Sequence, residues 1–196
     1  YFGIKSPLRR EILRNFINVN GLPEIGQLKQ ITHDCWAKPE REFQYFIMEI
    51  LGKMAKKAEP SRIDLYEYIA LHKSWWDTID YIAANLVGVH FQHYPEQIIP
   101  YTEKWMDSGN MWMQRTALLF QLKYGEKTDL DLMTRYIERL LGTKEFFINK
   151  AIGWVLRQYS KTDPGWVIEY VNKNENKLAG LSQREALKWL DRKGKL

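Results

Sequence analysis

Trp76 and Asp80 are the residues of this chain whose types and spacing could carry chemistry. They are four positions apart in the segment 73–80. Because residues i and i+4 are neighbours on one face of a helix, an indole would lie beside a carboxylate. That arrangement is a poor salt bridge, but it suits an electron-poor sugar or base. The alternative is a solvated Asp80 next to a Trp76 that belongs to the core.

Arg115 and Trp154 are further candidates. Arg115 lies among apolar neighbours in 111–118, so it either pairs with a carboxylate or points toward a phosphate. Trp154 taken alone is more simply a core residue. Asp77 has a structural explanation, because Ser74 is expected to cap a helix with Asp77 at the third position of a capping box.

The elements that must position these residues are helices. Helical periodicity runs through nearly the whole chain, and no alternating strand pattern or Asn-Gly hairpin turn is found. Breakers such as Glu59-Pro60-Ser61 and Thr162-Asp163-Pro164 divide the chain into about eleven helices. Near the beginning, Ser6 is expected as an N-cap with Pro7 in the first turn.

A repeat organises the helices. The segments that begin at Arg41, Asp77, Met113 and Asn149 are separated by 77−41, 113−77 and 149−113, which is 36 residues each time. A helix pair every ~36 residues is typical of a HEAT-like repeat. We therefore predict an all-α fold, a HEAT-like α-solenoid of about five to six helix pairs with a concave basic groove, forming a single domain over 1–196. The alternative is an irregular helical bundle. Equivalent repeat positions hold Phe46, Ile82, Leu118 and Trp154.

The composition of the chain excludes several classes of protein and site. The chain has 196 residues, a net charge of +5 and one cysteine, Cys35, which excludes an intramolecular disulfide and a multi-cysteine zinc site. No apolar run is long enough for a transmembrane helix. His90 and His93 have a ligand-like spacing but no obvious third ligand, so no metal site is predicted. The first residue is not Met, and we expect N-terminal helices to be missing or trimmed.

The order and spacing of the candidates resemble a known family. The stretch 75–80, Arg115 about one repeat later and Trp154 about another repeat later resemble the active-site set of the AlkD-like alkylpurine DNA glycosylases. The stretch 2–10 resembles the opening DNA-contacting turn of that family, and 39–46 resembles its second-repeat signature. The resemblance covers essentially the whole chain.

The resemblance implies a role for each candidate. Trp76 and Trp154 would form an aromatic cradle, Asp80 would be the catalytic carboxylate, and Arg115 would contact DNA near the lesion. The implied reaction is hydrolysis of the N-glycosidic bond of cationic N3- or N7-alkylated purines in duplex DNA, which leaves an abasic site. No lysine lies inside this set, so no Schiff-base lyase step is expected. No cofactor is expected.

The expected partner is double-stranded DNA containing alkylated bases, bound by a monomer in the cytoplasm with no membrane association. Each basic candidate could instead be merely solvated. The rival hypothesis is a non-catalytic HEAT-type module that binds DNA structures or a protein, but such a module needs no carboxylate facing phosphates. The residues predicted to bind the DNA backbone are Lys5, Ser6, Arg9, Arg10, Lys73, Lys123, Lys150 and Arg157.

Overall fold

The computed structural model describes residues 1–195, and within that range it contains helices and no strand. The all-α prediction is therefore confirmed. The chain divides into two compact units, Tyr1–Tyr94 and a second unit that begins at Pro95. The prediction of a single domain stays a prediction.

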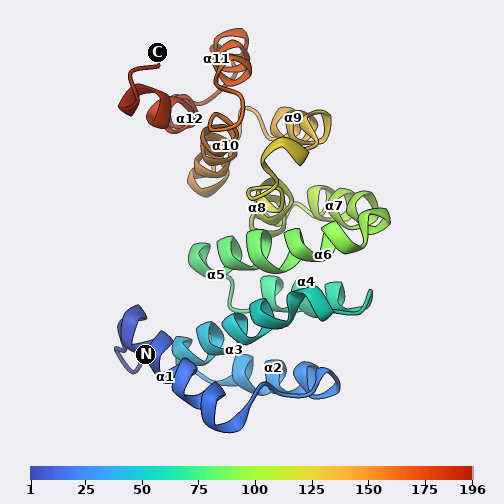
Figure 1. Cartoon of the computed structure of the whole chain (residues 1–196). Helices are drawn as coiled ribbons and strands as arrows, with labels where there is room; N and C mark the ends of the chain where they lie inside the picture. The colour runs from blue at the N-terminus through green and yellow to red at the C-terminus, as the bar shows by residue number, and fades with distance from the viewer. Residues whose placement is uncertain (196) are drawn as a thin grey trace. The chain divides into compact units, whose positions relative to one another are not determined.

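The first unit runs from blue to green in Figure 1. α3 packs against α1, α2 and α5, and α4 packs against the helical run that follows α5. Its core consists of fully buried aromatic and branched side chains, among them Trp36, Ile63 and Ile79. The α-helices of this unit are α1 (Ser6–Asn20), α2 (Leu28–Ala37), α3 (Arg41–Met54), α4 (Arg62–Leu71), α5 (Trp76–Tyr81) and α6 (Gly88–His93).

A π-helical segment, η3 (Ile82–Val87), joins α5 to α6. The three pieces form one helical run over 76–93. A π segment holds more residues per turn than an α-helix and often lies near functional sites. The π segment therefore changes which face of the helical run the side chains after it occupy. It begins at Ile82, two positions after Asp80.

The second unit runs from green to red in Figure 1. α8 packs against α7, α9 and α10, while α12 packs against α10 and α11. Trp105, Phe120 and Tyr136 are among its fully buried side chains. The α-helices of this unit are α7 (Ile98–Asp107), α8 (Met111–Leu119), α9 (Leu130–Arg139), α10 (Phe146–Tyr159), α11 (Pro164–Lys173) and α12 (Gly180–Arg192).

The 36-residue period reappears in hydrogen bonds between successive repeats. The Trp36 indole N–H donates to the carbonyl of His72 at 2.7 Å, and the Tyr94 hydroxyl donates to the carbonyl of Ala58 at 2.9 Å. Both pairs are separated by 36 residues. Equivalent positions in neighbouring repeats therefore meet within a unit, which is what stacked helix pairs require.

Candidate nucleic-acid interface and active site

The segment before α5 folds differently from the sequence prediction. The N-cap of α5 is Trp75, in an extended conformation and without a side-chain cap. Ser74 is not the cap, because its hydroxyl donates to the carbonyl of Ala70 at 2.5 Å. Lys73 has a positive φ of 53°, and its ammonium group donates to the carbonyls of Ala37 and Lys38. The loop is thus tied back to the end of α2 and leads directly into Trp76.

Trp76 lies on the surface of the first unit. The residue is 46% exposed, and its neighbour Trp75 is 48% exposed. The alternative of a core Trp76 is therefore wrong. Asp80, one helical turn later, is partly buried. Two large indoles in water at the start of a helix, with a carboxylate on the next turn, form a surface suited to an aromatic, electron-poor ligand.

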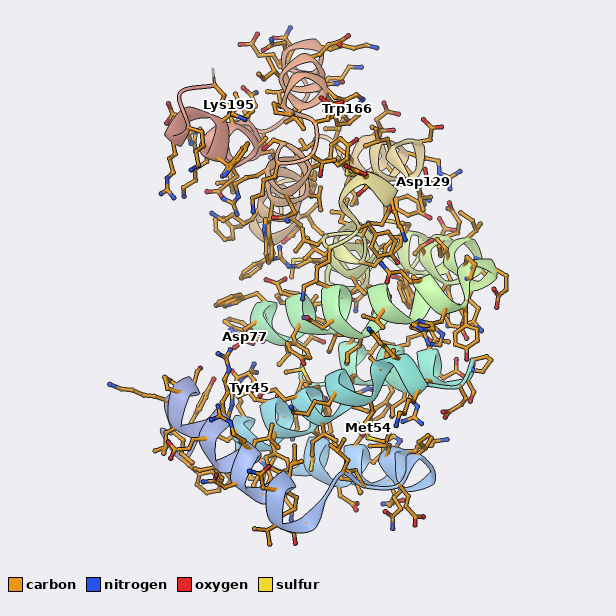
Figure 2. The ribbon with its side chains drawn as sticks, viewed as in Figure 1. Tyr45, Met54, Asp77, Asp129, Trp166 and Lys195 are labelled. Carbon is orange, nitrogen blue, oxygen red and sulfur yellow. The ribbon has the colours of Figure 1, made fainter. Side chains whose placement is uncertain are left out.

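Asp77 is an ion-pair partner rather than a helix cap. Its Oδ1 accepts from Arg41 Nη2 at 2.6 Å, and its Oδ2 accepts from the Tyr45 hydroxyl at 2.6 Å. Tyr45 and Asp77 lie close together at the same end of α3 and α5 (Figure 2). The capping-box interpretation was wrong because the capping hydroxyl of Ser74 is used in the preceding turn. Arg41 and Asp77 occupy equivalent repeat positions, and this offset was the sequence signal that could have predicted the pair.

An open hollow of about 770 Å³ lies beside this ion pair, within the first unit. Asp77 and Tyr45 line it, and so do residues at the start of α1. The four N-terminal residues predicted to bind DNA also line the hollow, and so does Lys53, which was not among the predicted contacts. These lining residues are Lys5, Ser6, Arg9, Arg10 and Lys53. The hollow therefore gathers positive charge next to the first turn of α5.

The start of α1 supplies backbone N–H groups to this hollow. The helix begins at Ser6 with Lys5 as N-cap and Pro7 in the first turn. The prediction of Ser6 as N-cap was thus one residue late, and that of Pro7 is confirmed. Free N–H groups and the helix dipole favour an anion at this end.

The turn before α1 is fixed by a buried carboxylate. Glu42 Oε1 accepts the backbone N–H groups of Phe2 and Gly3 at 3.0 Å and that of Ile4 at 3.3 Å. Burial raises the pKa of Glu42, but hydrogen bonds from backbone N–H groups outweigh it and hold the pKa below its usual value. Glu42 therefore stays ionised at neutral pH and fixes the turn that leads to Lys5.

Arg9 already forms an ion pair within the first unit. Its Nη2 donates to Glu49 Oε1 at 3.0 Å, and its guanidinium lies 4.3 Å from the centroid of the Tyr45 ring. The side chain of Arg10 is exposed. We therefore expect Arg10 and Lys5 to be the more available of the N-terminal cations for a phosphate.

In the second unit, Arg115 is only 2% exposed. Its Nη1 donates to the carbonyl of Phe147 in the first turn of α10, and its guanidinium lies 6.0 Å from the Phe147 ring centroid. The side chain thus holds the start of α10, which carries Trp154. Trp154 itself is partly exposed, so it is not a fully buried core residue.

Lys150 and Arg157, also on α10, converge on one carboxylate of α12. Lys150 Nζ lies 2.8 Å from Glu185 Oε1, and Arg157 forms an ion pair with Glu185 Oε2. Burial raises the pKa of Glu185, but these cations and Lys188 lower it overall. Three cations around one carboxylate leave a net positive charge on this part of the unit.

The remaining predicted backbone contacts, Lys73 and Lys123, are exposed. Over residues 1–195, no group of three His, Cys, Asp or Glu side chains is arranged to hold a metal ion. In the same part of the chain, no helix has the length and apolar character needed to cross a bilayer.

Comparisons with known proteins place the chain in a DNA alkylation repair family. A family model described as DNA alkylation repair enzyme matches residues 1–190. The chain is also similar to a solved structure, a predicted DNA alkylation repair enzyme from Enterococcus faecalis. The sequence identity is 32%, the TM-score is 0.86, and the match covers 96% of this chain and 87% of that one. No curated protein matches. The predicted α-solenoid fold class is confirmed by this similarity.

Proposed function

Because the chain belongs to the DNA alkylation repair enzyme family, we propose that it is a monofunctional DNA glycosylase. It hydrolyses the N-glycosidic bond of cationic N3- or N7-alkylated purines in duplex DNA and leaves an abasic site. The observation that carries the proposal is the exposed Trp76, with 46% of its surface accessible, one helical turn from Asp80.

The chemistry needs little beyond these groups. An alkylated purine carries a positive charge and leaves as a neutral base, so no general acid is required. An indole face attracts the cationic base, which is worth roughly 0.5–2 kcal/mol per contact. Asp80 stabilises the oxocarbenium-like sugar and orients the attacking water. This division of roles favours cationic lesions over neutral ones.

The second unit contributes Trp154 and Arg115 in this proposal. Trp154 is the aromatic contact with DNA that we propose for this unit. Arg115 is only 2% exposed, so we propose that it supports the site by holding the start of the helix that carries Trp154, through its bond to the carbonyl of Phe147; a direct contact between Arg115 and DNA stays a prediction. The exposed cations among the predicted backbone contacts bind phosphates and carry no base-specific readout.

Release of free base tests the function directly. Duplex DNA containing N7-methylguanine is incubated with the protein, and the soluble fraction is analysed for the free base. We expect N7-methylguanine release and DNA that is cleaved only after alkali treatment. Absence of free base would contradict glycosylase activity, and strand cleavage without alkali would contradict the monofunctional assignment.

A further inference from the structure

Asp77 lies at the centre of a polar network that joins three helices of the first unit. Arg41 Nε donates to the Tyr45 hydroxyl at 3.2 Å, and both residues donate to the Asp77 carboxylate. The Tyr45 ring lies near two guanidinium groups, those of Arg9 at 4.3 Å and Arg41 at 5.3 Å. The network thus connects α1 and α3 to the first turn of α5.

The protonation states suit this network. Burial and the nearby Asp77 raise the pKa of Tyr45 well above its usual value, so the hydroxyl stays protonated and donates. Burial lowers the pKa of Arg41, but its bonds to Tyr45 and Asp77 raise it overall. The pair is partly buried, with side-chain exposures of 18% for Arg41 and 28% for Asp77, so water screens it less than a surface pair.

Because Asp77 lies in the first turn of α5, the network can affect the orientation of Trp76. Asp77 follows Trp76 directly and precedes Asp80 by three positions. The N-cap of α5 offers no side-chain hydrogen bond, and nearly half of the Trp76 surface is in water, so core packing does little to orient its indole. The Asp77 carboxylate is held at both oxygens. Together with the buried Thr78 and Ile79, this anchors the first turn of α5 and with it the directions in which Trp76 and Asp80 leave the helix.

We propose that Asp77, held by Arg41 and Tyr45, is a positioning residue for the excision reaction: it orients Trp76 and Asp80 without touching the substrate. This proposal rests on the proposed glycosylase function. Such positioning can matter for the rate, because a misplacement of about 1 Å at a reacting group can cost about 10² in rate.

A double-mutant cycle of Asp77→Asn and Arg41→Gln distinguishes positioning from direct electrostatics. If Asp77 only positions, each variant slows single-turnover release of N7-methylguanine by about tenfold, and the double variant is no slower than either single variant. If the Asp77 charge itself stabilised the transition state, Asp77→Asn would slow the reaction while Arg41→Gln, which removes an opposing charge, would leave it unchanged or faster. That second pattern would overturn the proposal.

Two further measurements separate positioning from lost stability. The affinity for DNA that carries an uncleavable abasic analogue is expected to stay within about twofold of wild type in each variant, because the phosphate contacts are unchanged. Tyr45→Phe keeps the ion pair and removes one hydrogen bond, so we expect a smaller rate loss than in Asp77→Asn. A loss of affinity that matches the loss of rate would overturn the proposal.

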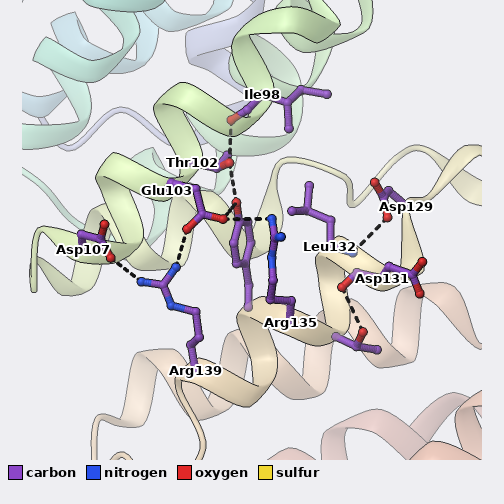
Figure 3. A network of polar contacts seen from close by, with 11 residues as sticks. Ile98, Thr102, Glu103, Asp107, Asp129, Asp131, Leu132, Arg135 and Arg139 are labelled. Atoms are coloured by element: carbon purple, nitrogen blue, oxygen red, sulfur yellow. Dashed lines mark hydrogen bonds and ion pairs between the residues drawn. The ribbon is translucent and has the colours of Figure 1, made fainter.

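The matched control is a second ion-pair network between repeats, in the second unit (Figure 3). There Arg139 bonds to Glu103 and Asp107, and the separation of Arg139 and Glu103 is again 36 residues. Its residues belong to α7 and α9, which carry none of the candidate site residues. Arg139→Gln is therefore expected to lower the unfolding temperature and to leave the excision rate at the wild-type value.

The outcomes separate this proposal from the proposed function. If the wild-type protein releases no base, the glycosylase function fails, and the positioning role fails with it. If the wild-type protein and Asp77→Asn release base at the same rate, only the positioning role is overturned. A tenfold loss in Asp77→Asn and Arg41→Gln, with Arg139→Gln unaffected, supports it.

Discussion

At the scale of single residues, exposure separates the candidate aromatic residues from the core. Trp36 and Trp105 are each 1% exposed and belong to the core of their units. Trp76 is 46% exposed, although burying an indole is strongly favourable. We propose that this exposed indole beside a carboxylate serves binding rather than folding.

Replacing Trp76 by Ala tests the binding role of this indole. We expect single-turnover release of N7-methylguanine to slow by about 2- to 30-fold, which corresponds to the loss of one cation–π contact with the cationic sugar that develops as the base leaves. The free energy of unfolding should change by about 1 kcal/mol or less, because the side chain is half exposed. Urea unfolding and the excision assay measure the two quantities.

Trp166→Ala is the matched control for Trp76. This indole lies on α11, partly exposed, and stacks on Tyr170 with ring centroids 5.1 Å apart. Its loss is expected to leave the excision rate unchanged. Equal rate losses in the two variants would show that Trp76 has no special role.

The sequence identified the types of the site residues better than their partners. Trp76 and Asp80 could be placed on one helix face from their spacing alone. The partners of Asp77 could not be predicted, because a Ser three positions before an Asp satisfies the capping-box pattern whether or not the hydroxyl is free. The burial of Arg115 was equally hidden, since its apolar neighbours fitted both alternatives that the sequence allowed.

At the scale of the elements, the turn residues predicted most helix boundaries. Asp163 caps α11 by accepting from the backbone N–H of Trp166 at 2.9 Å, and Ser61 lies at the N-cap of α4. The π segment η3 had no sequence signal, because it depends on how a whole turn packs rather than on a residue type. Its position after Asp80 was therefore found only in the structure.

The packing of α10 on α12 depends on Gly153, the residue before Trp154. A Cβ at Gly153 would lie 2.5 Å from the Cβ of Glu185 and 2.7 Å from the carbonyl oxygen of Ser182. The Ser182 hydroxyl also donates to the carbonyl of Asn149 at 2.8 Å. The two helices therefore approach closely only because position 153 has no side chain.

Gly153→Ala is predicted to separate α10 from α12. We expect the free energy of unfolding to fall by about 1–3 kcal/mol, the usual cost of overpacking, as measured by urea denaturation. Gly165→Ala is the control, since its Cβ would meet only Asp163 Oδ1 at 3.6 Å. That variant should be neutral or gain up to about 1 kcal/mol from helix propensity. Equal stability of both variants would contradict the close packing at Gly153.

At the scale of the whole molecule, the 36-residue period was the most informative feature of the sequence. It predicted the stacked helix pairs of each unit, and the family match over residues 1–190 agrees with it. The basic groove remains a prediction, because charge along a sequence does not say which cations are paired. Arg9, Lys150 and Arg157 each have a carboxylate partner within their unit.

DNA affinity is therefore predicted to depend steeply on salt through the exposed cations. Four of the predicted backbone contacts are exposed lysines or arginines: Lys5, Arg10, Lys73 and Lys123. Four phosphate contacts would lower the affinity by about two orders of magnitude between about 50 and 200 mM salt. Fluorescence anisotropy with labelled duplex DNA measures this slope. An affinity that is flat over this range would contradict phosphate binding.

The central claim is that the Asp80 carboxylate promotes the departure of a cationic base, and the most direct test is single-turnover release of N7-methylguanine by Asp80→Asn. Asn keeps the shape and removes the charge, so we expect the rate to fall by about 10²–10³ while DNA binding is unchanged or slightly tighter. Asp34→Asn, at an exposed carboxylate on α2 that accepts from Gln30 at 2.8 Å, should excise at the wild-type rate. Excision by Asp80→Asn at the wild-type rate would contradict the catalytic role assigned to Asp80.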